Sequence, residues 1–242
     1  MHNFKGVIAY KGTRYYGWQK TGSFPTIEEE LEKAATQILN QPVTFQAASR
    51  TDRGVHAEGQ VINFIAPDYE RLQRGIQALL PPDIALISLD KEKDSFHPTL
   101  DAKGKEYHYF ICNRPYQLPF HRDFSWHVKN PLDLEKMKAA LPLLLGERDF
   151  SAFSNERIPQ EKKRRHLTRL TLVPLEEGRI KIEVEGKSFL YKMVRNLIGT
   201  LVYVGCQKIS LEELPLIINS GKRALAGVTA PAHGLVLKRV LY

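Results

Sequence analysis

Residues 47–63, with the sequence ASRTDRGVHAEGQVINF, place one carboxylate between two guanidinium groups. Arg50, Asp52 and Arg53 lie within four positions, and a glycine and His56 follow before an apolar alternation typical of a strand. Two cationic neighbours favour the ionised form of a carboxylate and can bind a phosphate backbone. An ionised carboxylate can act as a nucleophile or stabilise an oxocarbenium-like sugar centre. Asp and Gly are also common in surface turns, so these residues alone leave both interpretations open.

A metal site is not indicated by the sequence. His56 and Glu58 form an H-x-E pair, as in the zinc nucleobase deaminases, but those enzymes also need P-C-x-x-C. The two cysteines, Cys112 and Cys206, are far apart and belong to no such pair. We therefore expect no metal and two reduced, packed thiols, as in a cytoplasmic protein.

The charge of the chain favours a polyanionic partner. Its 242 residues include 35 Lys+Arg and 27 Asp+Glu, a formal net charge of +8. Such an excess is typical of proteins that bind nucleic acid. The longest apolar stretch, NLIGTLVYVGC, is about half the length that crosses a bilayer. We expect a soluble, cytoplasmic protein with no membrane partner.

Two stretches mix basic residues with other features of RNA-binding surfaces. The sequence YKGTRYYGWQK at 10–20 could stack bases on aromatic side chains and contact phosphates through Arg14, or its aromatic residues could pack in the core. The segment 154–169, which we expect to be a loop, carries a basic run that fits RNA contact or a solvated surface. That run consists of Lys162, Lys163, Arg164 and Arg165.

Two further stretches place polar groups in apolar surroundings. The strand-like sequence KEYHYFICN at 105–113 puts Tyr107 and Tyr109 on one face, where core packing and a binding role are both open. In FLYKMVRNLIGTLVYVG at 189–205, Arg195 lies in an otherwise apolar helix. A charge so placed is rarely buried without a carboxylate partner, although an arginine at the helix rim can extend to water.

The periodicity of apolar residues predicts an α+β fold. Strands are expected at 4–10, 43–48, 60–65, 84–89, 104–112, 167–174, 179–185 and 234–240. Helices are expected at 27–39, 69–80, 132–145, 189–204 and 211–219. Thr26 and Glu29 have the spacing of a capping box, Asn130-Pro131 suits the start of the third helix, and Gly146 suits its end.

The order of these elements predicts two halves. It reads β-α-β-β-α-β, one more strand, and then α-β-β-α-α-β, which resembles two ferredoxin-like (RRM-like) halves with antiparallel sheets. The proline- and aromatic-rich stretch 113–130 suits a break between them. We therefore predict an N-terminal half at 1–113 and a C-terminal half at 114–242, joined around a central basic cleft.

Taken together, six stretches resemble the tRNA pseudouridine synthases of the TruA type, in the order of that family and along nearly the whole chain. They are AYKGTRYYGWQ, SRTDRGVHAEGQV, AKGKEYHYFI, GERDFSAFS, FLYKMVRNLIGTLVYVG and APAHGLVLKRVLY. One departure is visible, because the family usually has glycine immediately before R-T-D and this chain has Ser49. If the family has glycine there because the position needs a positive φ, serine alters the path of the loop. If the position needs only a small residue, serine changes nothing.

The resemblance implies roles for particular residues. Asp52 takes the position of the essential aspartate, and Arg195 would pair with it and keep it ionised. Tyr107 would stack on the uracil, and Arg50 would help to flip and hold the nucleotide. The resemblance also implies pseudouridine formation at positions 38, 39 and 40 of the tRNA anticodon arm, no cofactor, and a homodimer with one tRNA spanning both subunits.

The residues give less support to two alternative functions. A non-catalytic RNA-binding module with RRM-like sheets would use the basic and aromatic residues but gains nothing from Asp52, which repels phosphate. A nucleoside hydrolase would need a metal or a second carboxylate, and neither is evident. Isomerisation moves uracil from a C–N to a C–C bond without redox change, which suits one key carboxylate and no cofactor.

Overall fold

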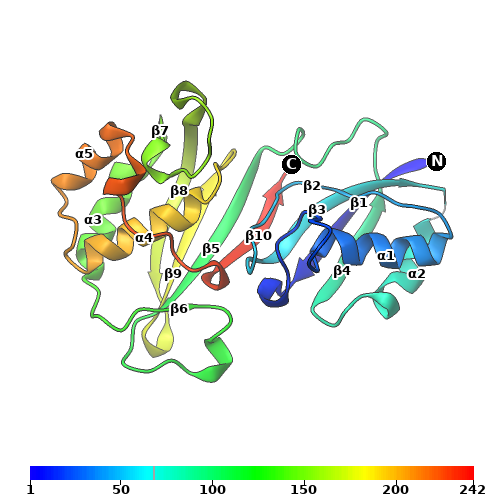
Figure 1. The fold of residues 1–242 in the computed structure, drawn as a ribbon, viewed down its shortest axis with the longest axis horizontal. Helices are drawn as coiled ribbons and strands as arrows, with labels where there is room; N and C mark the ends of the chain where they lie inside the picture. Colours follow the sequence, from blue (N-terminus) through cyan, green and yellow to red (C-terminus); the bar gives the residue numbers. More distant parts are fainter. Residues whose placement is uncertain (68) are drawn as a thin grey trace. The chain divides into compact units, whose positions relative to one another are not determined.

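The computed structural model describes residues 1–67 and 69–242 and divides the chain into two compact units (Figure 1). The first unit contains Met1–Lys103 together with Val236–Tyr242, and the second contains Gly104–Leu235. The C-terminal strand thus belongs to the same unit as the N-terminus. Every helix among the described residues is too short or too polar to span a membrane.

The first unit is built on a largely antiparallel sheet in which β1 lies between β4 and β3. The short strand β2 pairs with β3 on the edge opposite β1, and β10 pairs in parallel with the start of β3. The strands are β1 (His2–Tyr10), β2 (Gln46–Ala47), β3 (His56–Ala66), β4 (Ile84–Lys91) and β10 (Leu235–Leu241). Apolar side chains alternate along β1, where Phe4, Ile8 and Tyr10 are buried.

Two helices, α1 (Ile27–Leu39) and α2 (Tyr69–Leu79), contact each other and lie on one face of this sheet (Figure 1). The buried residues of α1 recur at helical spacing, which gives the helix one apolar face. Thr26 caps the start of α1, because its side chain accepts the backbone N–H of Glu29.

In the second unit the strands follow the order β5-β9-β8-β7, with antiparallel pairing. The short strand β6 pairs in parallel with the end of β5. The strands are β5 (Gly104–Cys112), β6 (Trp126–His127), β7 (Gly146–Asp149), β8 (Arg164–Pro174) and β9 (Arg179–Gly186). The helices are α3 (Leu134–Leu144), α4 (Met193–Gly205) and α5 (Glu213–Ser220); α3 contacts α4, α5 and β8.

Most predicted elements are confirmed, and α1 has the predicted bounds. The predicted start of α3 at Asn130-Pro131 is wrong. Asp133 is the N-cap and accepts the backbone N–H of Lys136, so the helix begins at Leu134, two residues after the predicted start at 132. Strands β6 and β7 were missed because two and four residues are too few to show an alternation.

The units differ from the predicted halves, 1–113 and 114–242, in two places. Strand β5 pairs with β9 from Lys105 to Cys112, so it belongs to the second unit. Strand β10 pairs with His56 and Ala57 of β3, so the C-terminus belongs to the first. Both differences come from long-range strand pairing, which local composition does not encode. The coarse fold class, a mixed α and β protein with largely antiparallel strand pairing, is confirmed.

Candidate active site

The loop that carries Asp52 is fixed at its start by a buried glutamine. The amide of Gln60, which is fully buried, accepts the backbone N–H of Ser49 at 3.1 Å and donates to the Ser49 carbonyl at 2.6 Å. Ser49 is not among the residues with positive φ. Serine therefore costs no backbone strain at this position.

Next to the carboxylate, Thr51 fastens the loop to the segment that follows β1. Its hydroxyl hydrogen-bonds the hydroxyl of Tyr10 at 2.8 Å, and its carbonyl accepts the backbone N–H of Trp18 at 3.1 Å. A Cβ atom on Gly17 would lie 2.6 Å from that carbonyl oxygen, and the φ of Gly17 is +95°. Only glycine allows both the conformation and the approach at this position.

Beyond the carboxylate, the loop closes as a tight turn against the short helix Gly12–Arg14. The carbonyl of Asp52 accepts the backbone N–H of Val55 at 3.1 Å. A Cβ atom on Gly12 would lie 2.0 Å from the Val55 carbonyl oxygen, and the Gly12 N–H donates to Nδ1 of buried His56 at 3.0 Å. Asp52 is thus held half-buried between two anchored residues, while its neighbours Arg50 and Arg53 are exposed.

Residues 10–20 therefore support the Asp52 loop. Trp18 is 2 % exposed, in agreement with the core-packing alternative. The ring of Tyr16 stacks on Phe24 at 4.0 Å, and the guanidinium of Arg53 lies 4.0 Å from the Tyr16 ring centroid. This three-layer stack orders the side chain immediately after Asp52.

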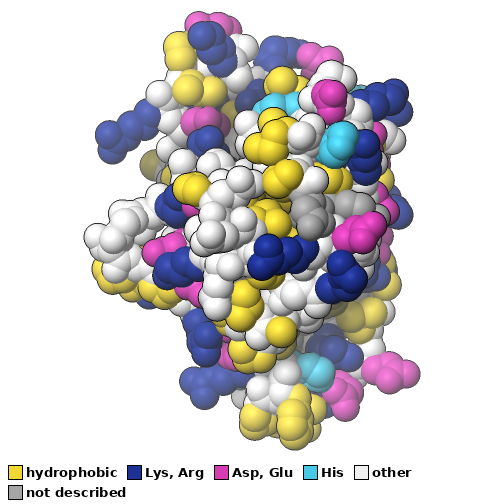
Figure 2. Space-filling model, turned by 90° about the vertical axis from the view of Figure 1, so that its right-hand side faces the viewer, with side chains coloured by type: hydrophobic (Ala, Val, Ile, Leu, Met, Phe, Trp, Pro, Cys, Tyr) yellow, Lys and Arg dark blue, Asp and Glu magenta, His cyan; other side chains and the backbone are white. Residues whose placement is uncertain are grey.

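Arg14 pairs with a carboxylate of its own unit. Its Nε lies 3.0 Å from Asp83, and the hydroxyl of Tyr15 donates to the same carboxylate at 2.5 Å. The hydrogen bond with Tyr15 and the charge of Asp83 raise the pKa of the exposed Arg14. This compensation lowers the charge that Arg14 offers to a phosphate. On the face drawn in Figure 2, other lysine and arginine side chains are likewise interspersed with acidic ones.

In the second unit, the position of Arg195 on α4 is set by the segment 226–231. Its Nε donates to the carbonyl of Ala230 at 2.8 Å, and the Ala230 N–H donates to the Arg195 carbonyl at 3.0 Å. The hydroxyl of Tyr109 donates to the carbonyl of Pro231 at 2.9 Å. Burial raises the pKa of Tyr109, and the nearby charge of Arg195 opposes this shift. The guanidinium is half-buried beside the Tyr109 face of β5.

Tyr107 lies on that same face of β5. Its side chain is 7 % exposed, and its ring meets Phe189 edge to face at a centroid distance of 5.1 Å. The prediction that Tyr107 and Tyr109 share a face agrees with their common burial.

A buried polar network behind Arg195 was missed by the sequence analysis. The Asn196 side chain donates to the carbonyl of Phe153 at 2.7 Å and accepts from Arg223 and from the hydroxyl of Thr229. A Cβ atom on Gly199 would lie 1.6 Å from the carbonyl oxygen of Val228. Helix α4 and the segment 226–231 are therefore in backbone contact, which a sequence pattern cannot reveal.

The basic run is more ordered than predicted. Strand β8 confirms the strand predicted at 167–174 but begins three residues earlier, at Arg164, so the expected loop ends at residue 163. Lys162 and Lys163 end a short 3-10 helix, Arg164 lies 3.3 Å from Glu147 across the β7–β8 pair, and Arg165 donates to the Lys162 carbonyl at 2.9 Å. Cross-strand pairing with β7 extends the strand into charged sequence.

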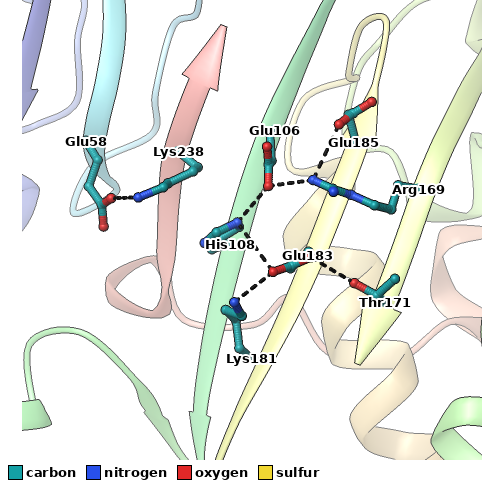
Figure 3. Close-up of polar contacts among 9 residues, drawn as sticks. All are labelled: Glu58, Glu106, His108, Arg169, Thr171, Lys181, Glu183, Glu185 and Lys238. Atoms are coloured by element: carbon teal, nitrogen blue, oxygen red, sulfur yellow. Dashed lines mark hydrogen bonds and ion pairs between the residues drawn. The ribbon is translucent and has the colours of Figure 1, made fainter. Parts of the chain in front are cut away.

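A cluster of potential metal ligands on β5 and β9 was also missed. Glu106, His108 and Glu183 present ligand atoms within 4.8 Å of one another. Arg169 lies 2.6 Å from Glu106, and Lys181 lies 2.7 Å from Glu183 (Figure 3). The hydrogen bond from Lys181 is the main cause of the lowered pKa of Glu183. Both carboxylates are thus already compensated by cations, and we assign the cluster as an ion-pair network.

Comparison with known proteins decides the family. The family model described as tRNA pseudouridine synthase matches residues 7–105 and 140–242. The chain is 46 % identical to tRNA pseudouridine synthase A 2 of Protochlamydia amoebophila (strain UWE25), over 100 % of this chain and 95 % of that protein. It is 41 % identical to tRNA pseudouridine synthase A of Thermoanaerobacter sp. (strain X514), over 100 % of both.

The chain belongs to the tRNA pseudouridine synthase family. This confirms the resemblance inferred from the six sequence stretches, and with it the assignment as an isomerase. Asp52 and Arg195 lie inside the matched ranges, whereas Tyr107 lies just beyond the first. The roles of these residues, and those of Arg50, Arg14 and the basic run, remain predictions.

The contact at Gly199 gives a prediction for this family member. Gly199→Ala should lower the free energy of unfolding by about 1–3 kcal/mol, because the new methyl group overlaps a backbone carbonyl. Activity on tRNA should fall as well, since the displaced segment carries Ala230, which fixes Arg195. Urea unfolding and the rate of pseudouridine formation are the measurements.

Gly75→Ala is the matched control. Gly75 is also a helical glycine, but its Cβ would meet only Ile38, at 3.4 Å. Alanine is the better helix former, so this variant should be neutral or more stable and fully active. Equal behaviour of the two variants would contradict the proposed importance of the α4 contact.

Proposed function

We propose that this chain converts uridine to pseudouridine at positions 38, 39 and 40 of the tRNA anticodon arm, with Asp52 as the nucleophile. The observation that carries the proposal is the position of Asp52. Its carboxylate lies half-buried in a loop whose backbone is anchored on both sides, through Thr51 and through Val55. A surface turn has no need of such anchoring, whereas a nucleophile gains rate from being held in place.

The reaction needs few groups. The C–N bond between ribose and uracil breaks, the base turns, and a C–C bond forms on the same base, so no electrons are gained or lost. Uracil leaves as a delocalised anion, which reduces the need for a general acid. A proton leaves the ring carbon and one is gained at nitrogen, so the protons balance. One ionised carboxylate and a surface that retains the base are sufficient, and we propose no cofactor or metal.

We propose that Arg195 pairs with the carboxylate of Asp52. The bond from its Nε to Ala230 and its place beside Tyr109 support this role, because they orient the guanidinium. Tyr107, whose ring is packed edge to face against Phe189, is proposed to stack on the uracil. Arg50, exposed next to the anchored loop, is proposed to hold the flipped nucleotide.

Arg14 and the basic run are proposed as weaker contacts to the RNA backbone. Lys162 is exposed at the end of its short helix and suits phosphate contact. Arg14 and Arg164 each lie near a carboxylate, which reduces the charge they offer.

The finer description of the fold is part of the proposal. In the first unit, the chain order β1-α1-β2-β3-α2-β4 and the pairing of β1 with β3 and β4 support a ferredoxin-like half. In the second unit, the adjacency of β5, β9 and β8 with helices α3 and α4 supports another. A homodimer with a shared tRNA and a location in the cytoplasm are proposed on the family resemblance.

Replacement of the nucleophile is the direct test. Asp52→Asn keeps the shape of the side chain and removes its charge, so pseudouridine formation should fall by several orders of magnitude. Binding of tRNA should change little. Unmodified tRNA transcript, incubated with purified protein and EDTA, followed by mapping of pseudouridine with carbodiimide, measures the effect. Appreciable turnover by a verified Asp52→Asn preparation would exclude the assignment.

A second prediction concerns Arg195. Arg195→Met should nearly abolish turnover, and any residual activity should increase with pH, because loss of the cation favours the protonated carboxyl. The unpaired, half-buried carboxylate should also lower the free energy of unfolding, by less than the about 3–5 kcal/mol that is typical when a fully buried pair loses one partner. Arg195→Lys should restore activity only in part, since an ammonium lacks the two-pronged geometry. Near-normal rates for both variants would favour the alternative of an arginine at the helix rim.

A further inference from the structure

The segment 113–125, drawn in green in Figure 1, connects β5 to β6. It exposes three aromatic side chains. Phe120 is 87 % exposed, Tyr116 60 % and Phe124 39 %. Single exposed apolar residues are normal on a protein surface. Three aromatic rings within nine positions of one connecting segment are a concentration that the packing of the second unit does not explain.

A basic pocket lies in the same part of the chain. It has a volume of about 310 Å³ and is lined by Pro115, Gln117, Pro119, Arg122, His127 and Lys129. None of these is acidic. In the part of the chain that the structure describes, neither Arg122 nor Lys129 lies within 4.0 Å of a carboxylate. The two cations of the pocket therefore form no ion pair within the described residues, although Asp123 follows Arg122 in the chain and Glu177 lies 3.7 Å from His121 of the same segment.

The segment is also internally ordered. The side chain of Gln117 donates to the carbonyl of Ser125 at 2.9 Å, and the hydroxyl of Ser125 donates to the carbonyl of His121 at 2.9 Å. The imidazole of His127 hydrogen-bonds the carbonyl of Arg114 at 2.8 Å. The segment that carries the pocket and the three exposed rings, here called the aromatic rim, is thus ordered before any ligand binds, which reduces the entropy lost on binding.

We propose that this segment is a second tRNA-contact site, in which the pocket binds a backbone phosphate and Phe120 stacks on an adjacent unpaired base. Uncompensated cations beside exposed aromatic rings are the combination that binds single-stranded nucleic acid. The proposal rests on the proposed function only for the identity of the RNA. Residues 106–139, which include this site, lie outside the two ranges matched by the family model.

Charge argues for RNA over a protein partner. An acidic peptide could also enter a basic pocket, but it offers a ring to Phe120 only where an aromatic side chain stands beside the acidic one, whereas every nucleotide joins a phosphate to a base. A second copy of this chain would bring its own net charge of +8 to a site that is already basic. A nucleotide supplies both the phosphate and the ring.

The test measures tRNA binding by the full chain at several salt concentrations. Arg122→Gln combined with Lys129→Gln should flatten the slope of log K against log salt by about 0.7–0.9, the contribution of the one phosphate that the pocket binds. Phe120→Ala should weaken binding by about 5- to 100-fold. Both variants should raise KM and leave kcat at saturating tRNA within about twofold, since neither touches the reacting atoms.

Matched controls separate a site from a general effect of charge or exposure. Arg74→Gln combined with Lys138→Gln removes the same charge at positions that pair with Glu70 and Glu135. Leu100→Ala removes an apolar side chain that is 78 % exposed in the other unit. Both controls should leave the slope and the affinity unchanged, and uridine monophosphate at millimolar concentration should compete poorly with tRNA.

Each other outcome overturns the inference. Equal slopes for pocket and control variants would show that the pocket does not meet RNA. Loss of self-association in Phe120→Ala, with unchanged tRNA binding, would assign the aromatic rim to contact between copies. Efficient competition by uridine monophosphate would assign the pocket to a free nucleotide. If the unvaried protein binds tRNA but makes no pseudouridine, the proposed function fails while the binding test remains valid.

Discussion

Close backbone contact between the segment 12–18 and the Asp52 loop is the constraint on which the candidate site depends. At Gly17 and Gly12, carbonyl oxygens of the loop lie where a Cβ atom would be, at 2.6 and 2.0 Å. The carbonyl oxygens of the loop thus fill the space that a side chain would take at these glycines, so the loop has almost no room to move toward the segment 12–18. A carboxylate that must meet one ribose carbon benefits from such restriction, because misplacement by about 1 Å can cost two orders of magnitude in rate.

The second unit uses the same physical device around Arg195. Gly199 and Gly227 allow helix α4 and the segment 226–231 to approach until backbone meets backbone. The buried side chain of Asn196 then satisfies polar groups that this approach removes from water. The guanidinium that results is oriented by a main-chain carbonyl, which does not change rotamer as a side-chain partner can. Each unit therefore presents one charged group on a rigid backbone support.

The sequence analysis predicted features that neighbouring residues determine and missed features that depend on contacts between distant segments. The bounds of α1 follow from its apolar spacing and from Thr26, both local features. The role of Gly12 and Gly17 could not be predicted, because close approach is a property of two segments together. The aromatic and basic residues at 10–20 suggested RNA binding, because composition alone does not reveal whether an aromatic side chain such as Trp18 is buried or exposed. Arg164 was expected in a loop because its strand pairing with β7 is not visible locally.

The net charge of the chain does not distinguish cations that have a carboxylate partner from cations that have none. The structure makes this distinction for individual residues. The sum of +8 counts Arg14, Arg164 and Arg169 equally with Arg122 and Lys129. The first three lie near carboxylates, at 3.0, 3.3 and 2.6 Å. A cation that already has such a partner gains little from a phosphate, because it must lose one favourable contact to make another. The cations that attract RNA most strongly are therefore those that folding leaves uncompensated. In the second unit, such cations lie in a preformed pocket in the same segment as exposed aromatic rings. The net charge attracts tRNA to the protein as a whole. The cations without a carboxylate partner then determine where the phosphate backbone of the RNA binds.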